Sequence, residues 1–285
     1  SHVSDDKKES GHLNAYKLEL DFFLNKINKI HSIRSIFFGG GTPSLMHPNT
    51  VFEILEYIKN HPLLKWDMPE ITLEANPSSS EYNKFKDFKS AGINRLSIGV
   101  QSLNEEYLKF LGRKHSATEA KNALKMASEI FDEYSFDLIY CLPNQSLSEW
   151  RKELEFALEN YGKNHISAYT LTIEKGTPFF NMHANKAFLL PSNEDDFYDL
   201  TNTLLAKHGF ERYEIPNYAK NQKYSIHNLG YWQSIDYIGL GAGAHGRITI
   251  DDERFITQNF SNPIKFLNSV FENNNALQVF QRMEN

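Results

Sequence analysis

Apolar residues recur along the chain at two spacings, one typical of helices and one typical of strands. In residues 13–30 the apolar positions fall three and four apart, which predicts an amphipathic helix. Its apolar stripe comprises Leu13, Tyr16, Leu20, Phe23, Leu24 and Ile27. The next run, "SIFF" at 35–38, is short and ends in three consecutive apolar residues, so it predicts a buried strand.

This alternation continues through the first two-thirds of the chain. Further strands are expected at 70–75, 95–100, 136–142 and 165–173, and further helices at 49–60, 79–92, 116–131 and 146–159. The helix starts are marked by capping boxes, Ser116 with Glu119 and Ser146 with Glu149, and by Asn49 or Thr50. Strands alternating with helices predict an α/β protein with a parallel sheet, in a barrel or a doubly wound fold.

The rhythm changes beyond about residue 180. A capped helix is expected at 192–210, a strand at 211–219, and a glycine-rich strand with a turn at 237–250. No change of composition and no Pro/Ser-rich linker separates this part from the preceding one. We therefore expect residues 181–285 to be an extension packed on residues 1–180, not an independent domain.

Composition and charge exclude several classes of protein. The 285 residues are 40% hydrophobic and 23% charged, which is typical of a globular protein. The net charge of −6 argues against a nucleic-acid partner, and no apolar run is long enough to span a membrane. The polar N-terminus shows no signal peptide, and a single cysteine, Cys141, suits a cytoplasmic protein without disulfides. One thiolate cannot hold a zinc ion or an iron–sulfur cluster alone, so no metal ligands are assigned.

Polar residues and glycines follow the predicted strands, where ligands of such sheets bind. They are Gly39–Thr42, Glu74, Gln101, Asp137 and Thr172, with Arg113 nearby in the chain. The glycines match neither a P-loop nor a dinucleotide fingerprint and could be a simple turn, and Glu74 and Arg113 could be surface residues. Asp137 is harder to explain so, because it interrupts an apolar strand and a buried carboxylate needs a partner. Together they offer bare amides, carboxylates, an amide side chain and a guanidinium, which suit an amino acid joined to a ribose.

Six ordered motifs, "FFGGGTPS", "EITLEANP", "GINRLSIGVQS", "LGRKH", "FDLIYCLP" and "ISAYTLTIEKGTP", carry a family resemblance. The chain closely resembles the oxygen-independent coproporphyrinogen oxidase-like branch of the radical S-adenosylmethionine (SAM) enzymes. The resemblance implies an incomplete (β/α)6 TIM-like barrel at 1–180 and a C-terminal extension at 181–285 that crosses its open side.

The same resemblance implies where S-adenosylmethionine would bind. Gly40, Gly41 and Thr42 would lie along its amino-acid end, and Arg113 would meet its carboxylate. Further contacts would come from Glu74 and Gln101 to ribose or amino-acid atoms, from Asp137 to a ribose hydroxyl, and from Thr172 to the adenine.

Within this branch, "HNLGYW" matches the HNxxYW signature of the HemW-type haem chaperones, which the oxidases proper lack. It implies that His227, Asn228, Tyr231 and Trp232 contact haem, because imidazole ligates iron and aromatic rings stack on a porphyrin. The alternative is that His227 caps local backbone and Trp232 fills a core.

The chain departs from the family in three places. It lacks the CxxxCxxC strand that holds a 4Fe–4S cluster and the usual C-terminal segment, and it has Cys141 where glycine is common. We expect a piece of a longer protein whose intact form binds the cluster and S-adenosylmethionine and delivers haem to an acceptor protein. The alternatives are an oxidase that converts coproporphyrinogen III to protoporphyrinogen IX through a 5′-deoxyadenosyl radical, and a cluster-free porphyrin-binding scaffold.

Overall fold

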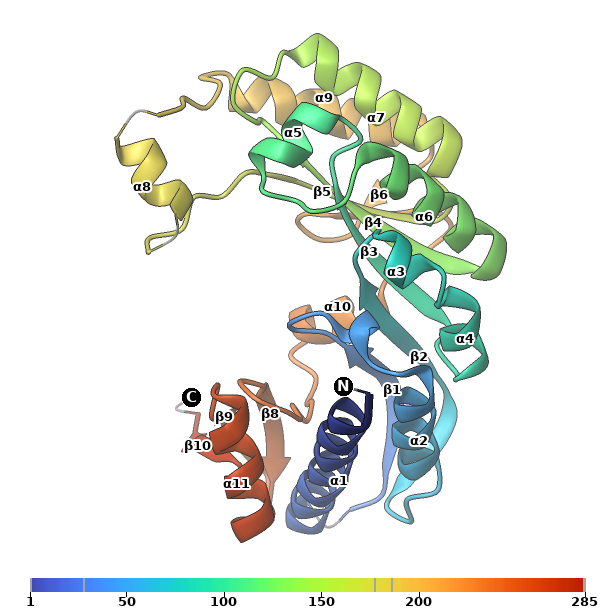
Figure 1. The fold of residues 1–285 in the computed structure, drawn as a ribbon, viewed down its shortest axis with the longest axis vertical. Helices are drawn as coiled ribbons and strands as arrows, with labels where there is room; N and C mark the ends of the chain where they lie inside the picture. Colours follow the sequence, from blue (N-terminus) through green and yellow to red (C-terminus); the bar gives the residue numbers. More distant parts are fainter. Residues whose placement is uncertain (1, 28, 177, 186, 284–285) are drawn as a thin grey trace. The chain divides into compact units, whose positions relative to one another are not determined.

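The computed structural model describes residues 2–27, 29–176, 178–185 and 187–283. Helices and strands alternate through most of the chain (Figure 1). Their order is α1 (His2–Ile27), β1 (His31–Phe38), η1 (Pro43–Leu45), α2 (Pro48–Lys59), β2 (Leu64–Ala75), α3 (Ser79–Tyr82), α4 (Phe85–Ser90), β3 (Arg95–Gln101), α5 (Glu105–Phe110), α6 (Ala117–Ile130), β4 (Glu133–Tyr140), α7 (Leu147–Tyr161), β5 (His165–Thr170), α8 (Pro178–Ala184), α9 (Glu194–Lys207), β6 (Glu211–Arg212), β7 (Asn217–Ala219), α10 (Ile226–Trp232), β8 (His245–Ile250), β9 (Glu253–Asn259), α11 (Pro263–Asn273) and β10 (Leu277–Arg282).

The larger sheet has seven strands in the order β1-β2-β3-β4-β5-β7-β6. Neighbouring strands from β2 to β5 are parallel, as the alternation predicts, whereas β7 and β6 add to β5 in antiparallel fashion. A second, antiparallel sheet has the order β10-β9-β8.

Two compact units make up the chain. Unit 1 comprises residues 1–36, 46–70 and 226–285, and unit 2 comprises residues 37–45 and 71–225. Each unit therefore contains segments that are distant in the sequence. The predicted boundary near residue 180 separates the family's barrel from its C-terminal extension, which is a different division from these two units. It stays a prediction.

Unit 2 is held together by apolar side chains between the parallel strands and the helices that connect them. Helix α6 packs on β3 and β4, and α7 packs on α9. The Trp150 side chain of α7 is fully buried, stacks on Tyr140 at 5.2 Å between ring centroids, and donates to the Thr201 hydroxyl at 2.8 Å. Both predicted capping boxes are present, at the N-termini of α6 and α7.

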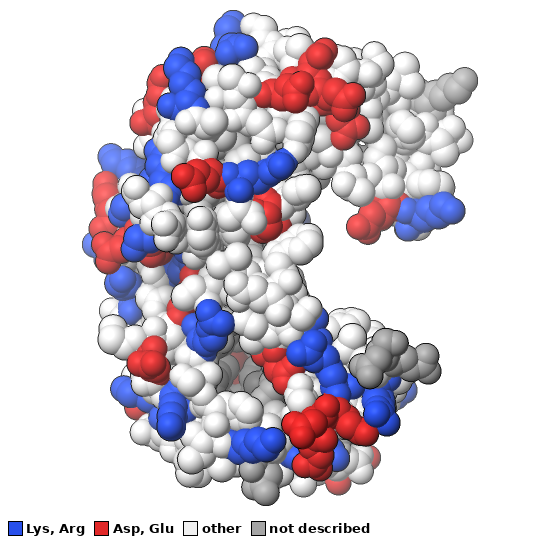
Figure 2. Space-filling model, turned by 180° about the vertical axis from the view of Figure 1, so that it is seen from behind, with Lys and Arg blue, Asp and Glu red and all other residues white. Residues whose placement is uncertain are grey.

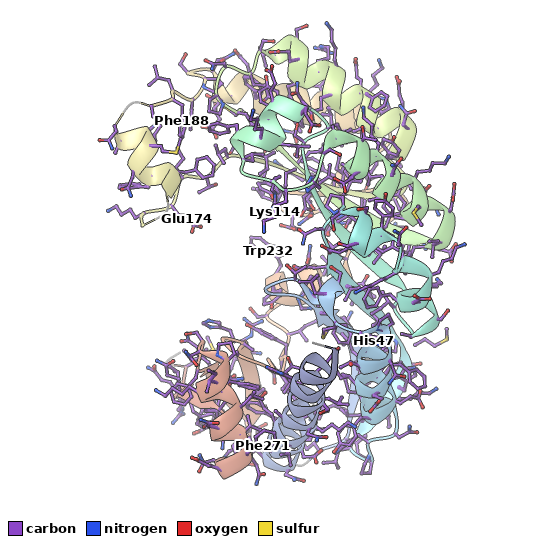
Figure 3. The ribbon with its side chains drawn as sticks, viewed as in Figure 1. His47, Lys114, Glu174, Phe188, Trp232 and Phe271 are labelled. Atoms are coloured by element: carbon purple, nitrogen blue, oxygen red, sulfur yellow. The ribbon has the colours of Figure 1, made fainter. Side chains whose placement is uncertain are left out.

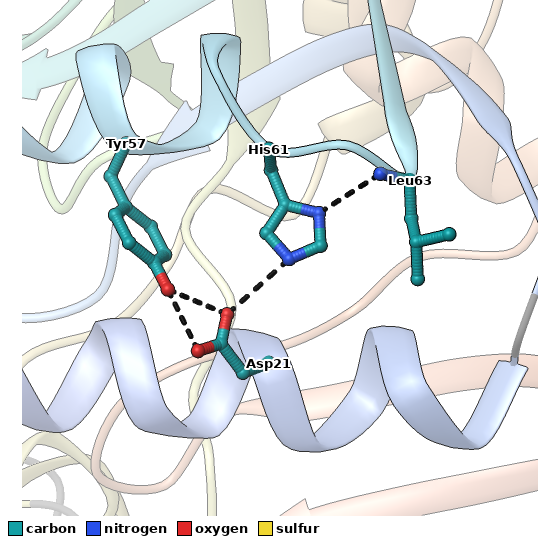
Figure 4. Close-up of polar contacts among 4 residues, drawn as sticks. All are labelled: Asp21, Tyr57, His61 and Leu63. Carbon is teal, nitrogen blue, oxygen red and sulfur yellow. Dashed lines mark hydrogen bonds and ion pairs between the residues drawn. The ribbon is translucent and has the colours of Figure 1, made fainter.

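Unit 1 is built around α1, which packs on α2, α11 and β8. The predicted stripe is confirmed in its main members, since Leu13, Leu20, Phe23 and Leu24 are buried. A polar network ties α1 to α2 (Figure 4). The Tyr57 hydroxyl donates to Asp21 at 2.7 Å, and His61 Nε2 lies 3.4 Å from the same carboxylate. His61 Nδ1 accepts from the Leu63 N–H, which places the ring proton on Nε2.

Several local expectations are wrong in detail. The strand at 35–38 is only partly buried, because β1 is at the end of the sheet and lacks a neighbour on one side. Helix α2 is capped by His47, whose ring accepts from the Asn49 N–H, not by Asn49 or Thr50. The helix expected at 79–92 is split into α3 and α4 around Asn83, a poor helix former.

Candidate functional site

One face of the parallel sheet is polar and partly open, whereas the other is apolar and buried. Side chains alternate between the two faces along each strand. The partly exposed face, here called the open face, consists of Glu74, Ser97, Gly99, Asp137, Ser167 and Tyr169. The residues that alternate with them on the same strands form the buried face, and they are Leu73, Ala75, Leu96, Ile98, Val100, Phe136, Leu138, Ile166 and Ala168. Because parallel sheets are usually apolar on both faces, this polar face indicates a binding surface.

The glycine loop that follows β1 lies against Glu74 at the end of β2. The Gly40 N–H donates to Glu74 Oε2 at 3.2 Å, and Gly40 has a φ of +106°. At Gly39 a Cβ would lie 2.6 Å from the Phe37 ring and 3.3 Å from the Glu74 carboxyl carbon. The loop therefore needs glycine at Gly39 for close approach and at Gly40 for its backbone conformation.

Glu81, which the sequence patterns do not single out, anchors the end of this loop. Its carboxylate accepts hydrogen bonds from the Ser44 hydroxyl and from the Asn76 N–H, the latter at 2.8 Å. The Asn76 side chain in turn reaches Thr42 Oγ1 at 3.5 Å. A carboxylate that is only 5% exposed thus joins the segment after the loop to the segment after β2.

Gln101 and Arg113 come together over Gly99. A Cβ on Gly99 would lie 3.2 Å from Gln101 Nε2 and 3.6 Å from an Arg113 guanidinium nitrogen. The Tyr169 hydroxyl donates to Gln101 Oε1 at 2.9 Å, which orients the amide group. Gly99 and Tyr169 are therefore site residues that the sequence patterns missed, although both lie on strands at positions that alternate with buried residues.

Asp137 lies at the centre of the open face, opposite Ser167 in the β4–β5 register. Burial raises the pKa of this carboxyl to about 6, and the negative charge of Glu74 adds to the rise. A hydrogen bond from Ser167 and the positive charge of Arg113 act in the opposite direction. Burial also raises the pKa of Glu74, against the effect of the Gly40 N–H. Two poorly solvated carboxylates and one guanidinium thus share the open face.

The structure brings together most of the predicted residues but not all of them. Gly40, Glu74, Gln101, Arg113 and Asp137 are linked by the contacts and charges given above. Thr42 joins them through Asn76. Gly41 and Thr172 are exposed, and their roles stay predictions.

The predicted haem contacts lie in unit 1, on the short helix α10. The His227 and Tyr231 rings meet edge to face at 5.0 Å, and Tyr231 meets Tyr237 in the same way at 4.8 Å. The His227 N–H donates to Glu70 Oε1 at 3.2 Å, which fixes the start of the helix to β2. Burial lowers the pKa of the His227 imidazole to about 4, so the ring is neutral near pH 7.

The alternative role for Trp232, as a core side chain, is wrong. The Trp232 side chain projects from α10 and is 65% exposed, and Tyr231 is 46% exposed (Figure 3). Asn228 lies in the same helix and is partly buried. Large aromatic side chains at the surface beside a neutral imidazole are an arrangement that favours a flat, apolar ligand.

Across the described residues, no three side chains among His, Cys, Asp and Glu gather as a metal ion would require, and Cys141 is buried. None of the described helices combines the length and apolarity needed to cross a bilayer. On the face drawn in Figure 2, lysines and arginines are interspersed with acidic residues.

Comparisons with known proteins identify the family of this chain. The family model described as the radical SAM superfamily matches residues 5–157. "Heme chaperone HemW" of Escherichia coli is 42% identical over 79% of this chain and 58% of its own length. "Heme chaperone HemW" of the Buchnera symbiont of Acyrthosiphon pisum is 37% identical over 92% of this chain and 70% of its own length. A zebrafish protein, "Radical S-adenosyl methionine domain-containing protein 1, mitochondrial", is 42% identical over 79% of this chain and 51% of its own length.

A solved structure, coproporphyrinogen III oxidase (HemN) from Escherichia coli, matches 97% of this chain and 65% of its own length with a TM-score of 0.76. At 21% identity this likeness shows the fold, which is the radical SAM TIM-like barrel type predicted from the motifs. The chain belongs to the radical SAM superfamily. Within the superfamily it belongs to the HemN-like branch, close to HemW. It spans between about half and about two-thirds of the length of most of these curated relatives.

Membership of the superfamily implies S-adenosylmethionine and a 4Fe–4S cluster. The open face fits the first, because desolvated carboxylates can accept from hydroxyl or ammonium groups and a guanidinium can pair with a carboxylate. The residues of this chain do not fit the cluster, because they include one cysteine and it is buried.

Proposed function

We propose that this chain is the S-adenosylmethionine-binding and haem-binding part of a radical SAM haem chaperone, which passes haem to an acceptor protein. The observation that carries the proposal is α10, where a neutral His227 imidazole lies beside the exposed Tyr231 ring and the helix ends at the exposed Trp232. A neutral imidazole is the form that ligates haem iron, and Tyr231 and Trp232 offer faces on which a porphyrin can lie. The relatives named as haem chaperones support it.

The proposed S-adenosylmethionine site uses the open face. Arg113 pairs with the carboxylate of the ligand, and Asp137 accepts from a ribose hydroxyl. Glu74 accepts from hydroxyl or ammonium groups while its other contact holds Gly40 in place. Gln101 is oriented by Tyr169, and the amides of the exposed Gly41 and the half-buried Thr42 lie along the amino-acid end. Thr172 is assigned to the adenine on the family resemblance alone.

The cellular location of the protein and the protein that receives haem from it are also proposed. We place the protein in the cytoplasm, as the sequence suggests, although the relatives from zebrafish and Dictyostelium are mitochondrial by name. The acceptor is a protein that takes up haem. Coproporphyrinogen oxidation remains the alternative function, and its distinguishing feature is a metal-free porphyrinogen as substrate.

Haem titration separates these functions. The chain should bind haem more tightly than metal-free coproporphyrin III, because iron ligation adds to stacking. His227→Ala should shift the Soret band and remove this preference, whereas His31→Ala, an exposed histidine of the same unit, should change neither. S-adenosylmethionine binding, measured by calorimetry, should be the same in all three proteins. Equal affinity for both porphyrins, unaffected by His227→Ala, would contradict the chaperone proposal and favour the oxidase or a simple porphyrin scaffold.

A further inference from the structure

A small pocket opens beside α10, entirely within unit 1. It is open to solvent, and the space of about 330 Å³ within and in front of it that no atoms fill includes part of that solvent. His227 and Tyr231 line it from α10, Tyr237 lines it from the following loop, and Arg34 and Ser35 line it from β1. The pocket therefore joins two of the four residues assigned to haem, His227 and Tyr231, with a strand on which the sequence patterns assign no function.

The charged side chains at this pocket differ in whether they have partners within the protein. Asp236 accepts from the Thr249 N–H at 2.7 Å and pairs with Arg254 at 3.6 Å. The neighbouring Arg247 donates to the Ile235 carbonyl at 2.9 Å and lies 5.6 Å from the Tyr237 ring. Asp236 is therefore already used within the protein, whereas Arg247 is used in part, since its buried Nε has no hydrogen-bond partner among the described residues.

Arg34 is different. Its side chain is exposed, and across the described residues no carboxylate is paired with it. Its neighbour Ser35 also lines the pocket. A guanidinium is well suited to a carboxylate, because its planar fork matches the two oxygens.

We propose that Arg34 binds a propionate carboxylate of haem whose ring lies on Tyr231 and Trp232. The proposal rests on the proposed function, since it takes haem as the ligand. Haem combines an apolar ring with two carboxylates on one edge, so its binding site needs aromatic surface and a cation at the same margin. The pocket supplies both, and its small volume suits one edge of the porphyrin. Arg34 would thereby select porphyrins that carry free carboxylates and set the ring's orientation over His227.

The test uses two probes, haem and its dimethyl ester, the latter dispersed in neutral detergent micelles that are also present with haem. The unmodified chain should bind haem about fivefold more tightly than the ester at low ionic strength, as expected for a partly screened ion pair. Arg34→Ala should lose this factor for haem and leave ester affinity unchanged, whereas Arg34→Lys should restore part of it. Added salt should reduce the preference. Arg151→Ala, which changes an exposed arginine of unit 2, is the matched control and should behave like the unmodified chain.

The possible outcomes distinguish a failure of the role of Arg34 from a failure of the proposed haem-binding function. If His227→Ala weakens haem binding but Arg34→Ala does not, and the ester binds as tightly as haem, the role of Arg34 is wrong and the proposed function stands. If the unmodified chain shows no His227-dependent haem binding, the proposed function fails and the role of Arg34 fails with it. Should Arg34→Ala unfold, the ester comparison on the unmodified chain and the Arg34→Gln variant still decide the question.

Discussion

The carboxylate of Glu19 accepts a hydrogen bond from the side-chain amide of Asn259, 240 positions later in the chain, at 2.5 Å. Its other oxygen accepts from the Gly241 N–H at 2.9 Å, and Asn259 also donates to the Gly241 carbonyl. Gly241 has a φ of +105°, which only glycine adopts easily. A fully buried carboxylate thus fastens the glycine-rich segment before β8 to α1.

Glu19 should make the stability of unit 1 depend on pH. Burial raises the pKa of its carboxyl to about 7, from 4.5 in a model compound. The folded protein therefore keeps a proton that the unfolded chain has lost, and stability should fall by about 2–3 kcal/mol as pH rises from about 4.5 to about 7. Glu19→Gln should remove this slope in urea unfolding measured across pH. Glu272→Gln, at an exposed carboxylate of α11, should retain it, and a flat profile for the unmodified chain would contradict the assignment.

Asp137 should cost stability and contribute to binding. Because its pKa is raised from 3.8 to about 6, stability should fall as pH rises through that range and stay reduced above it. Asp137→Asn should therefore raise the free energy of unfolding at pH 7.5 by about 1–2 kcal/mol, a figure that allows for the partial exposure of Asp137. Its urea midpoint should rise accordingly. The same variant should bind S-adenosylmethionine about fivefold more weakly, since a neutral acceptor replaces a charged one. Loss of stability together with loss of binding would indicate a purely structural residue.

Arg113→Ala should weaken S-adenosylmethionine binding without unfolding the protein. Removing a charge-assisted contact to the ligand carboxylate should cost roughly 1.5–3 kcal/mol, or about ten- to a hundredfold in affinity. The variant should also raise the pKa of Asp137 further, because Arg113 lowers it. Isothermal titration calorimetry checks the affinity, with Arg151→Ala as the control. Unchanged affinity in a folded variant would make Arg113 an ordinary surface residue.

Gly99→Ala tests whether the space over β3 belongs to the binding site. The added methyl would lie 3.2 Å from Gln101 Nε2, so the amide must shift and lose its orientation toward Tyr169. We expect S-adenosylmethionine affinity to fall about three- to tenfold, as for one lost hydrogen bond, with haem binding unchanged. Gly11→Ala, in α1 with no atom within 4 Å of the new methyl, should only stabilise the helix. Equal affinities in both variants would place the ligand elsewhere.

These 285 residues should not assemble a 4Fe–4S cluster. Such clusters are held by several cysteine thiolates, and the one thiol here is buried, with a pKa raised to about 11. Anaerobic reconstitution with iron and sulfide, followed by gel filtration, should leave no charge-transfer absorbance near 400 nm above that of Cys141→Ser. A stoichiometric cluster spectrum would show that other donors substitute for cysteine.

Local patterns in the sequence determined much of the fold. The parallel strands, the apolar stripe of α1 and the capping boxes at Ser116 and Ser146 were predictable because hydrophobic period and helix capping act over a few residues. The same patterns predicted that Glu74, Gln101, Arg113 and Asp137 lie close together. Strands that run in parallel bring their carboxyl ends to one edge.

Other features were decided only by tertiary packing. The strand expected at 211–219 is instead two short strands, β6 of two residues and β7 of three, because β7 pairs with β5 and β6 pairs with β7. Glu81, Tyr169 and Glu19 act on residues 37, 68 and 222 or more positions away. The sequence around a buried polar side chain carries no sign of its distant partner. Which groups it meets depends on how the helices and strands pack, because burial makes an unmatched polar group costly and so selects the arrangement in which each finds a partner.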